Sequence, residues 1–235
     1  MRPRPSPDSC DTEPVSEPLP EPHPTRGVFC NRTLNLRGVR AIGYDMDYTL
    51  IHYSVDEWER AAFEHAREWL AADGWPVADL TFDPRAFTLG LVFDLELGNL
   101  VKATRFGYVM RAQHGNELLS FDRQRREYFG TVIDLGEERF EFMNTLFELS
   151  RASLWCQLVD LHDRSGLPDV HSYGQLYRAI GRALDTVHTD GSLKAAILAD
   201  PERFVDADPH IVATLRDQRA AGKELVLITN SEWHY

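Results

Sequence analysis

The sequence predicts an α/β fold built around an open, largely parallel sheet. Residues 39–44 and 224–229 are short apolar stretches that each end in polar residues, which is typical of strands buried on both faces. The second stretch follows a helical pattern over 209–221 that stops at Gly222. A helix, a glycine, an apolar strand and a polar tip, in that order, indicate an α/β sheet.

The N-terminal 26 residues have a composition of their own. They hold eight of the thirteen prolines, mixed with serine, aspartate and glutamate. Such a segment cannot bury enough apolar surface to offset the entropy lost on ordering. We therefore expect residues 1–26 to form a disordered tail that acts as a spacer, with a proline-binding partner as the alternative.

A helix is expected directly after the first strand and its turn. Ser54 followed by Glu57 has the form of a capping box, and Gly74 is a suitable C-terminal stop. Between them, apolar residues recur at helical spacing and predict one buried face: Val55, Trp58, Ala62, Ala66 and Trp69.

The rest of the chain changes character several times. Residues 80–135 are rich in β-forming residues and turn residues, and they predict hairpins or short strands. Residues 137–164 and 172–189 predict helices. In the helix expected over 209–221, three apolar residues should face inward: Ile211, Val212 and Leu215.

Composition limits the classes of function. The 235 residues carry a formal net charge of −12, which argues against electrostatic binding of DNA or RNA. No apolar run reaches the roughly 18 residues of a membrane span, and no secretory signal follows the N-terminal arginines. The three cysteines lack the spacing of a zinc site or a disulfide framework. We expect a cytoplasmic protein with free thiols that binds neither nucleic acid nor membrane, and a homo-oligomer stays open.

Two carboxylates at the end of the first strand carry the strongest chemical signal. Asp45 and Asp47 follow the apolar stretch, at the end where open α/β sheets place their ligand sites. Two nearby carboxylates repel each other, which favours a bound cation or a proton held by one of them. Carboxylate oxygens suit Mg²⁺. The alternative is a pair of solvated turn residues, which are common in acidic proteins.

The second strand also ends in polar side chains. Thr229, Asn230 and Ser231 supply hydroxyl and amide donors, which can hold a phosphoryl oxygen together with backbone N–H groups. The same residue types also cap helices, and both roles can hold at once.

These segments resemble a known family. Asp45-Met46-Asp47-Tyr48-Thr49-Leu50 resembles the DxDxT motif of the haloacid dehalogenase superfamily, and Leu227-Ile228-Thr229-Asn230-Ser231 resembles its second motif. The form DMDYTL with TNS is similar to the cytosolic purine 5′-nucleotidases that prefer IMP or GMP. Four stretches between the motifs are similar to that family in the same order: 90–94, 98–102, 144–147 and 191–194.

The resemblance implies a reaction. Asp45 would attack phosphorus and become an aspartyl phosphate, while Asp47 would protonate the leaving ribose oxygen and then activate water. Mg²⁺ would be held by the Asp45 carboxylate and the Asp47 backbone carbonyl. The phosphate oxygens of a purine nucleoside monophosphate would be bound by Thr49, Thr229, Asn230 and Ser231.

The resemblance also implies residues that recognise the substrate. Phe147 would stack on the purine, although a core aromatic is an equally good interpretation of the residue by itself. Asp185, His188 and Lys194 match a family segment that contacts the nucleotide. A single acid or histidine on a helix is otherwise a solvated or satisfied side chain.

The family fold is a Rossmann-like haloacid dehalogenase core with a large α+β cap inserted between the two motifs. It implies core segments 27–54 and 205–235 and a cap over 55–204. The family's lysine motif and acidic pair lie beyond its second motif, so we expect this chain to be a truncated form with an incomplete core and little nucleotidase activity. Two alternatives stay open: another phosphatase or phosphotransferase of the superfamily, and an inactive nucleotide-binding or interaction module.

Overall fold

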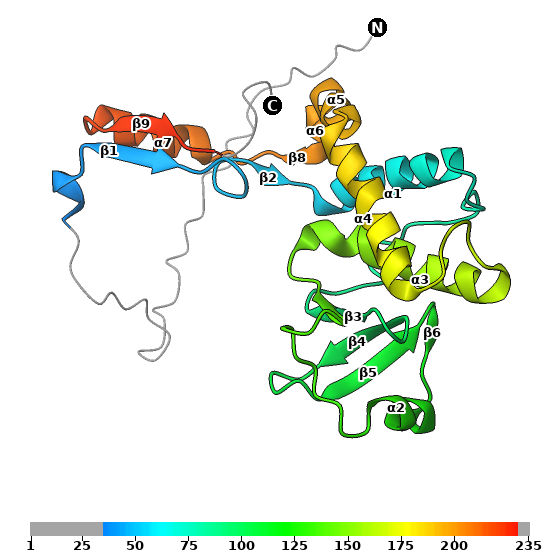
Figure 1. Cartoon of the computed structure of the whole chain (residues 1–235). Coiled ribbons are helices and arrows are strands. Elements are labelled where there is room, and N and C mark those ends of the chain that lie inside the picture. The colour runs from blue at the N-terminus through cyan, green and yellow to red at the C-terminus, as the bar shows by residue number, and fades with distance from the viewer. Residues whose placement is uncertain (1–34, 230–235) are drawn as a thin grey trace, which may run out of the picture. The chain divides into compact units, whose positions relative to one another are not determined.

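The computed structural model describes residues 35–229, which form helices and several small sheets (Figure 1). The chain divides into two compact units, Met1–Arg40 and Ala41–Tyr235, and the elements discussed below belong to the second. The first unit contributes only a 3-10 turn, η2 (Leu36–Gly38), to the described part. The expected tail over 1–26 lies outside the described residues, as do the side chains of Leu36, Leu146, Ser165, Val187 and His188.

The two apolar stretches form parallel strands, as predicted, and the structure shows that they are neighbours. β1 (Ala41–Tyr44) pairs with β9 (Glu224–Leu227), and Tyr44 stands opposite Leu227. Helix α7 (Ile211–Ala220) packs on β9. The pairing places the carboxyl ends of both strands at the same edge, which is the arrangement that a ligand site in an α/β sheet requires.

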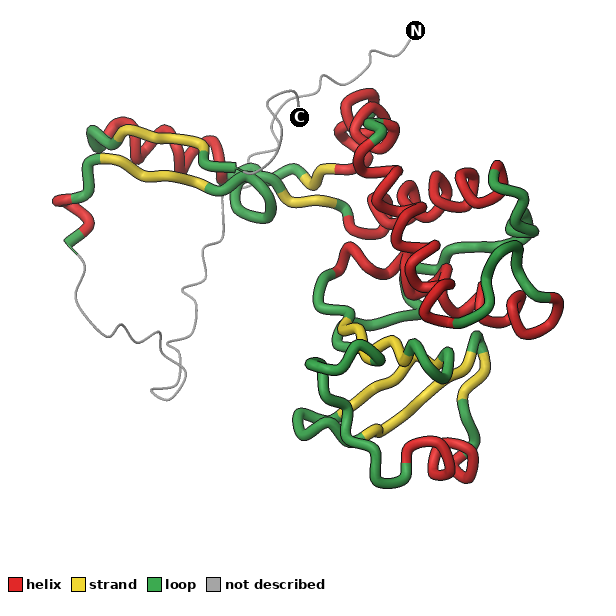
Figure 2. Tube along the Cα trace, viewed as in Figure 1, coloured by secondary structure: helices red, strands yellow, loops and turns green. Residues whose placement is uncertain are grey.

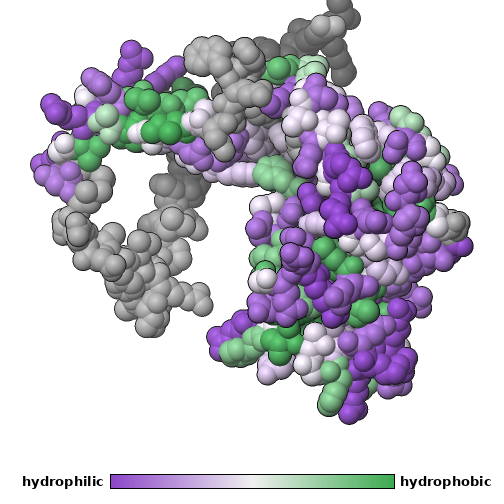
Figure 3. All heavy atoms as spheres, viewed as in Figure 1, coloured by the Kyte–Doolittle hydropathy of each residue, from purple (hydrophilic) through white to green (hydrophobic). Residues whose placement is uncertain are grey.

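The burial expected for these strands is wrong. Val226 and Leu227 are exposed, and Ile228 is 64% exposed. In α7, Val212 is also exposed, whereas Ile211 and Leu215 are half-buried. The reason is geometric: within residues 35–229 the sheet has two strands and one adjoining helix, which together cannot cover both faces. Figure 3 shows hydrophobic side chains gathered over these elements.

The helical part holds the main core. α1 (Val55–Ala72) packs against α3 (Leu149–Ser165), α4 (Tyr173–Thr189) and the shorter α5 (Ser192–Ala199) and α6 (Pro201–Phe204). All of the predicted inward residues of α1 are buried or partly buried against this core. No helix in the part that the structure describes is long and apolar enough to cross a bilayer.

The ends of α1 confirm one local prediction and correct another. The helix stops before Gly74, whose φ of +85° is the left-handed conformation that favours glycine. The capping box does not form, because Ser54 makes no side-chain capping bond. Instead the Glu57 carboxylate accepts a hydrogen bond from Arg203 Nε at 2.6 Å, so a residue distant in sequence replaces the local partner.

The middle of the chain forms an antiparallel sheet, as the hairpin prediction required (Figure 2). The order β6-β5-β4-β3-β7 leaves β6 and β7 at the edges. Helix α2 (Phe121–Tyr128) packs on β5. The five strands are β3 (Leu91–Asp94), β4 (Asn99–Ala103), β5 (Val109–His114), β6 (Glu117–Leu118) and β7 (Phe140–Phe142).

The helix predicted over 137–164 begins later than expected. Residues 140–142 form β7, and η3 (Leu146–Glu148) is a 3-10 turn that precedes α3. The backbone of β7 bonds to the edge of β3, where Phe140 lies opposite Asp94. Pairing with a strand almost 50 residues earlier overrides the local helical pattern.

A two-residue ribbon joins the helical part to β1 and β9. β2 (His52–Tyr53) follows the turn after β1, and β8 (Val205–Asp206) follows α6. The two pair antiparallel, with Tyr53 opposite Val205. The backbone N–H of Ser54 also donates to the carbonyl of Phe204 at 2.9 Å, which extends the connection by one residue.

A buried carboxyl group joins α1 to the start of α3. Glu59 is 1% exposed, and its Oε2 accepts the backbone N–H of Ser150 at 2.6 Å. Burial raises the pKa of Glu59 from 4.5 to about 7, against the lowering effect of the Ser150 hydrogen bonds. The neutral acid is therefore the form that the fold favours below neutral pH.

The raised pKa makes stability depend on pH. Between pH 4.5 and 7 the folded chain holds a proton that the unfolded chain releases, so the free energy of unfolding falls as pH rises through this range. Glu59→Gln cannot ionise, and we expect it to remove this fall and raise the free energy of unfolding at pH 8 by about 3 kcal/mol. At pH 4 the variant should match the unmodified protein.

Urea unfolding between pH 4 and pH 8 measures this effect. Glu64→Gln is the matched control, because Glu64 lies on the same helix and is exposed. It should leave the pH dependence unchanged. A Glu59→Gln variant that loses stability with rising pH as steeply as the unmodified protein contradicts the prediction.

Candidate functional site

Asp45 and Thr229 emerge from neighbouring strands at one edge of the sheet. The backbone N–H of Ile228 donates to the carbonyl of Tyr44 at 2.7 Å, one residue before each of these polar positions. The Asp45 carboxylate is exposed, and its Oδ1 accepts the backbone N–H of Met46 at 2.9 Å. Asn230 and Ser231, predicted to join Thr229, lie outside the described residues.

A tight turn follows Asp45 and gives the two aspartates different surroundings. The carbonyl of buried Met46 accepts the backbone N–H groups of Thr49, Leu50 and Ile51 at 3.0–3.3 Å. Tyr48 has a φ of +54°, an uncommon conformation for a residue other than glycine. We call residues 45–51 the aspartate loop. Thr49 is exposed in it, and its phosphate-binding role remains a prediction.

The Asp47 carboxylate is directed toward the connecting ribbon. The hydroxyl of Tyr53, on β2, donates to Asp47 Oδ1 at 2.5 Å. Asp47 is half-buried, whereas Asp45 is exposed. The turn therefore lets one carboxylate reach solvent while the other is held by a side chain from the next strand.

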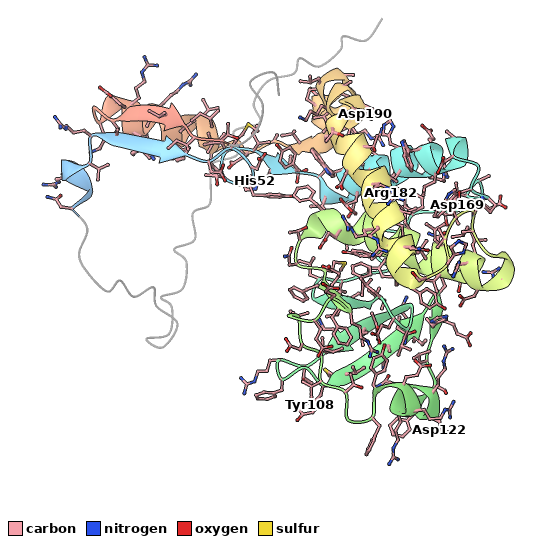
Figure 4. All side chains as sticks on the ribbon, viewed as in Figure 1. His52, Tyr108, Asp122, Asp169, Arg182 and Asp190 are labelled. Carbon is pink, nitrogen blue, oxygen red and sulfur yellow. The ribbon has the colours of Figure 1, made fainter. Side chains whose placement is uncertain are left out.

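Tyr48 of the aspartate loop packs with three other aromatic rings, and we call the four rings the aromatic cluster: Tyr48, Tyr53, Trp58 and Phe147. The Tyr53 ring is 5.6 Å from Tyr48 and 5.0 Å from Trp58 between centroids. Phe147 closes the cluster at 5.6 Å from Tyr48 and 5.5 Å from Trp58. Tilted and edge-on pairs of this kind stabilise a fixed ring arrangement. His52, which is labelled in Figure 4, lies next to Tyr53 on β2, and its ring contacts that of Tyr48.

Ring contacts therefore bring one predicted substrate residue to the aspartate loop. Phe147 lies in η3 and is half-buried among these rings. Asp185 is exposed on α4, and Lys194 is half-buried on α5. The side chain of His188 lies outside what the structure describes, and the roles of these three residues remain predictions.

Carboxylates concentrate negative charge around the loop. Burial raises the pKa of Tyr48, and the nearby charges of Glu59, Asp206 and Asp47 add to the effect. In the described range 35–229 no three histidine, cysteine, aspartate or glutamate side chains gather into a metal site. The donor chemistry nevertheless fits a hard cation in part, because the exposed Asp45 carboxylate offers oxygen in a negative environment.

The sequence did not predict the side-chain contacts between the aspartate loop and the ribbon. It places Trp58 only on the buried face of a helix, and it predicts no role for Tyr53. Two tyrosines in and just after an acidic motif were the available signal. Nothing local indicated that they would meet Phe147, which lies almost 100 residues away in the chain.

Comparison with known proteins identifies a family for the sequence. The sequence model described as "5′ nucleotidase family" matches residues 28–235. The Bos taurus "5′-nucleotidase domain-containing protein 1" is 27% identical over 220 residues, covering 86% of this chain and 49% of its own length. The Rattus norvegicus "5′-nucleotidase domain-containing protein 2" is 28% identical over 225 residues, covering 88% of this chain and 40% of its own. The chain thus spans half or less of the length of these curated relatives.

Proposed function

This chain belongs to the 5′ nucleotidase family, and we propose that the protein hydrolyses the 5′-phosphate of purine nucleoside monophosphates, with IMP and GMP as preferred substrates. The observation that carries the proposal is the parallel pairing of β1 with β9. It brings Asp45 and Thr229, the first of the proposed phosphate-binding residues after β9, to the same edge of a sheet. A nucleophile and phosphate-binding donors are needed at one place for phosphoryl transfer.

The proposed reaction has two steps. In the first, a carboxylate oxygen of Asp45 bonds to phosphorus, the bond from phosphorus to the ribose oxygen breaks, and Asp47 gives its proton to that oxygen. In the second, Asp47 takes a proton from water, which attacks phosphorus and releases phosphate from Asp45. The proton count balances, because Asp47 ends in the state in which it began. Thr49, Thr229, Asn230 and Ser231 are proposed to hold the phosphate oxygens.

Magnesium is proposed as the cofactor. A bound Mg²⁺ would neutralise part of the charge on the phosphoryl group, which the acidic surroundings of Tyr48 would otherwise repel. The Asp45 carboxylate and the Asp47 backbone carbonyl are the proposed protein ligands. Waters and phosphate oxygens are usual further ligands of this ion, and the family's acidic pair would complete the site.

The aromatic cluster supports a role in recognising the base. Phe147 presents an aromatic ring next to the aspartate loop, and a purine stacks favourably on such a face. Asp185, His188 and Lys194 are proposed to contact the rest of the nucleotide. A sugar phosphate offers no base to stack, so this cluster favours nucleotides over the alternative substrates.

We further propose the haloacid dehalogenase organisation, with core segments 27–54 and 205–235 and a cap over 55–204. The ribbon of β2 and β8 supports this division, because its strands lie where the two proposed segments meet the cap. A cytoplasmic location also remains a proposal. Because the relatives are about twice as long as the matched region or more, activity, substrate and metal are proposed for the whole protein.

Phosphate release by the whole protein from a panel of substrates tests the function. We expect kcat/KM for IMP and GMP to exceed that for UMP and ribose 5-phosphate by about tenfold or more. EDTA should abolish release, and added Mg²⁺ should restore it, because the charge on the transferring group is then neutralised again.

Two other results identify the competing functions. Preference for ribose 5-phosphate or another sugar phosphate over every nucleotide indicates a different phosphatase of the superfamily. Binding of IMP without release of phosphate, measured by calorimetry at saturating Mg²⁺, indicates an inactive nucleotide-binding module. Either result overturns the proposed reaction.

A further inference from the structure

We infer that Tyr53 is a positioning residue that orients the acid/base carboxylate of Asp47 for protonation of the leaving oxygen. The inference rests on the proposed function, because it assigns a role within that reaction. Tyr53 lies outside the aspartate loop, on β2 of the connecting ribbon. It therefore anchors Asp47 from a separate element.

The contact has the form of a strong, directional hydrogen bond. Tyr53 Oη donates to Asp47 Oδ1 at 2.5 Å, and the tyrosine is only 6% exposed. Hydrogen bonds to a carboxylate are shorter and stronger than those between neutral groups. Limited access of water to the tyrosine reduces competition for its hydroxyl.

The ring that carries this hydroxyl is fixed on several sides. Tyr48 packs edge-on against it at 5.6 Å and 77°, and Trp58 lies at 5.0 Å. Phe147 contacts it at 6.4 Å and 69°. The backbone of Tyr53 is paired with Val205 across the ribbon. Neither the ring nor its backbone can turn without disturbing these contacts, so the hydroxyl is a fixed reference point for Asp47.

Asp47 needs such a reference because of where its backbone lies. It belongs to a turn that contains a left-handed tyrosine and is closed by hydrogen bonds to the Met46 carbonyl. A short carboxylate on a turn can adopt several rotamers, and only some direct an oxygen at the leaving group. Tyr53 selects among them.

The hydrogen bond also distinguishes the two oxygens of Asp47. Oδ1 accepts a hydrogen bond from the Tyr53 hydroxyl. The proton that passes to the ribose oxygen in the first step is then carried by Oδ2. Tyr53 itself keeps its proton throughout and is not a catalytic residue in this scheme.

Tyr53→Phe tests the inference, because it removes the hydroxyl and keeps the ring. We expect kcat/KM for IMP to fall about tenfold, a part of the 10²–10⁴-fold that general acid catalysis typically supplies. For p-nitrophenyl phosphate, whose nitrophenolate departs without protonation, kcat/KM should fall by about twofold at most. Because kcat/KM reports the steps up to formation of the phosphoenzyme, the comparison isolates the protonation that Asp47 performs.

Tyr173→Phe is the matched control. The hydroxyl of Tyr173, on α4, donates to Asp163 Oδ1 at 2.9 Å, so this variant also removes a tyrosine–aspartate hydrogen bond. Asp163 belongs to α3 and Tyr173 to α4, so both residues are far from the aspartate loop in sequence. The control should leave the ratio of the two kcat/KM values unchanged.

A second measurement separates positioning from a general loss of structure. In an Asp47→Asn background, adding Tyr53→Phe should lower kcat/KM for IMP by less than about twofold, because the carboxylate that Tyr53 orients is already gone. If the falls in kcat/KM caused by Asp47→Asn and by Tyr53→Phe multiply in the double variant, that result overturns the inference. So does an equal fall for both substrates in the single variant, or no fall for either. If the unmodified protein hydrolyses p-nitrophenyl phosphate but not IMP, the nucleotidase proposal fails. The positioning role is then tested on another phosphate ester with a poor leaving group, and an unchanged kcat/KM of Tyr53→Phe for that ester overturns it separately.

Discussion

Asp45→Asn is expected to lower kcat for IMP by about 10³-fold or more, which is the largest effect anticipated from any single substitution in this protein. The amide keeps nearly the same size and can still accept the backbone N–H of Met46, so the aspartate loop should keep its shape. It cannot, however, supply a carboxylate oxygen to phosphorus. The loss therefore falls on the chemical step.

Two measurements make this prediction specific. After acid quenching of a reaction with phosphate-labelled IMP, the unmodified protein should carry label that hydroxylamine removes, as an acyl phosphate does, and Asp45→Asn should carry none. Binding of IMP in the presence of Mg²⁺ should survive in part, since other residues contact the nucleotide. Asp73→Asn, at the exposed end of α1, is the control and should retain full activity. Turnover retained by Asp45→Asn removes Asp45 as the nucleophile.

Asp94→Ala is expected to lower the free energy of unfolding by about 3–5 kcal/mol. Asp94 is fully buried on β3, where its carboxylate accepts Arg139 Nε at 2.9 Å and Nη2 at 2.6 Å. It also accepts a hydrogen bond from the hydroxyl of Tyr128 at 2.8 Å. Burial and the nearby Asp94 carboxylate raise the pKa of Tyr128, so the phenol remains a donor. Removing the carboxylate leaves a largely buried guanidinium and a buried phenol without their acceptor.

Glu96→Ala provides a control on the same arginine. Its carboxylate pairs with Arg139 Nη1 at 3.1 Å, but the Glu96 side chain is 65% exposed. Water screens such a pair, so its loss should cost less than about 1 kcal/mol. Urea unfolding of both variants at pH 7 measures the difference. Equal costs for the two contradict the view that burial, and not the ion pair itself, gives Asp94 its importance.

Asp94 also begins a network that ties the sheet to the helices. Tyr128 accepts a hydrogen bond from Asn99 Nδ2 at 2.9 Å, and Asn99 Oδ1 is 2.8 Å from His114 Nδ1. His114 Nε2 in turn is 2.6 Å from an oxygen of Asp163 on α3. The sheet and the helical part are therefore joined through polar side chains as well as through the apolar core.

Features with a local cause were predictable from the sequence. The stop of α1 at Gly74 depends on one residue that tolerates a left-handed conformation, and the buried face of α1 depends on helical spacing alone. Two parallel strands were predictable from two apolar stretches with polar ends, whereas the structure shows that they pair with each other. The sequence likewise identified Asp45 and Thr229 as polar residues at the ends of these strands, although their chemical roles stay predictions.

Features that depend on distant partners could not be predicted in the same way. The helix expected from residue 137 gave way to β7, because β3 offered a strand edge for pairing. Glu57 accepts a hydrogen bond from Arg203 instead of forming the expected capping box. Ile228 is exposed because little of the strand pair is covered in the described part.

Contiguous residues of the sequence identify the family, the two strand ends and the acidic motif. What surrounds that motif depends on the tertiary structure. Tyr53 reaches Asp47 because the aspartate loop brings the chain back beside Asp47 at Ile51, where the two residues form a parallel bridge. Phe147 reaches both tyrosines because η3 and α3 pack against α1. Contacts of this kind arise when elements far apart in the chain pack together, and the spacing of residues in the sequence does not predict them.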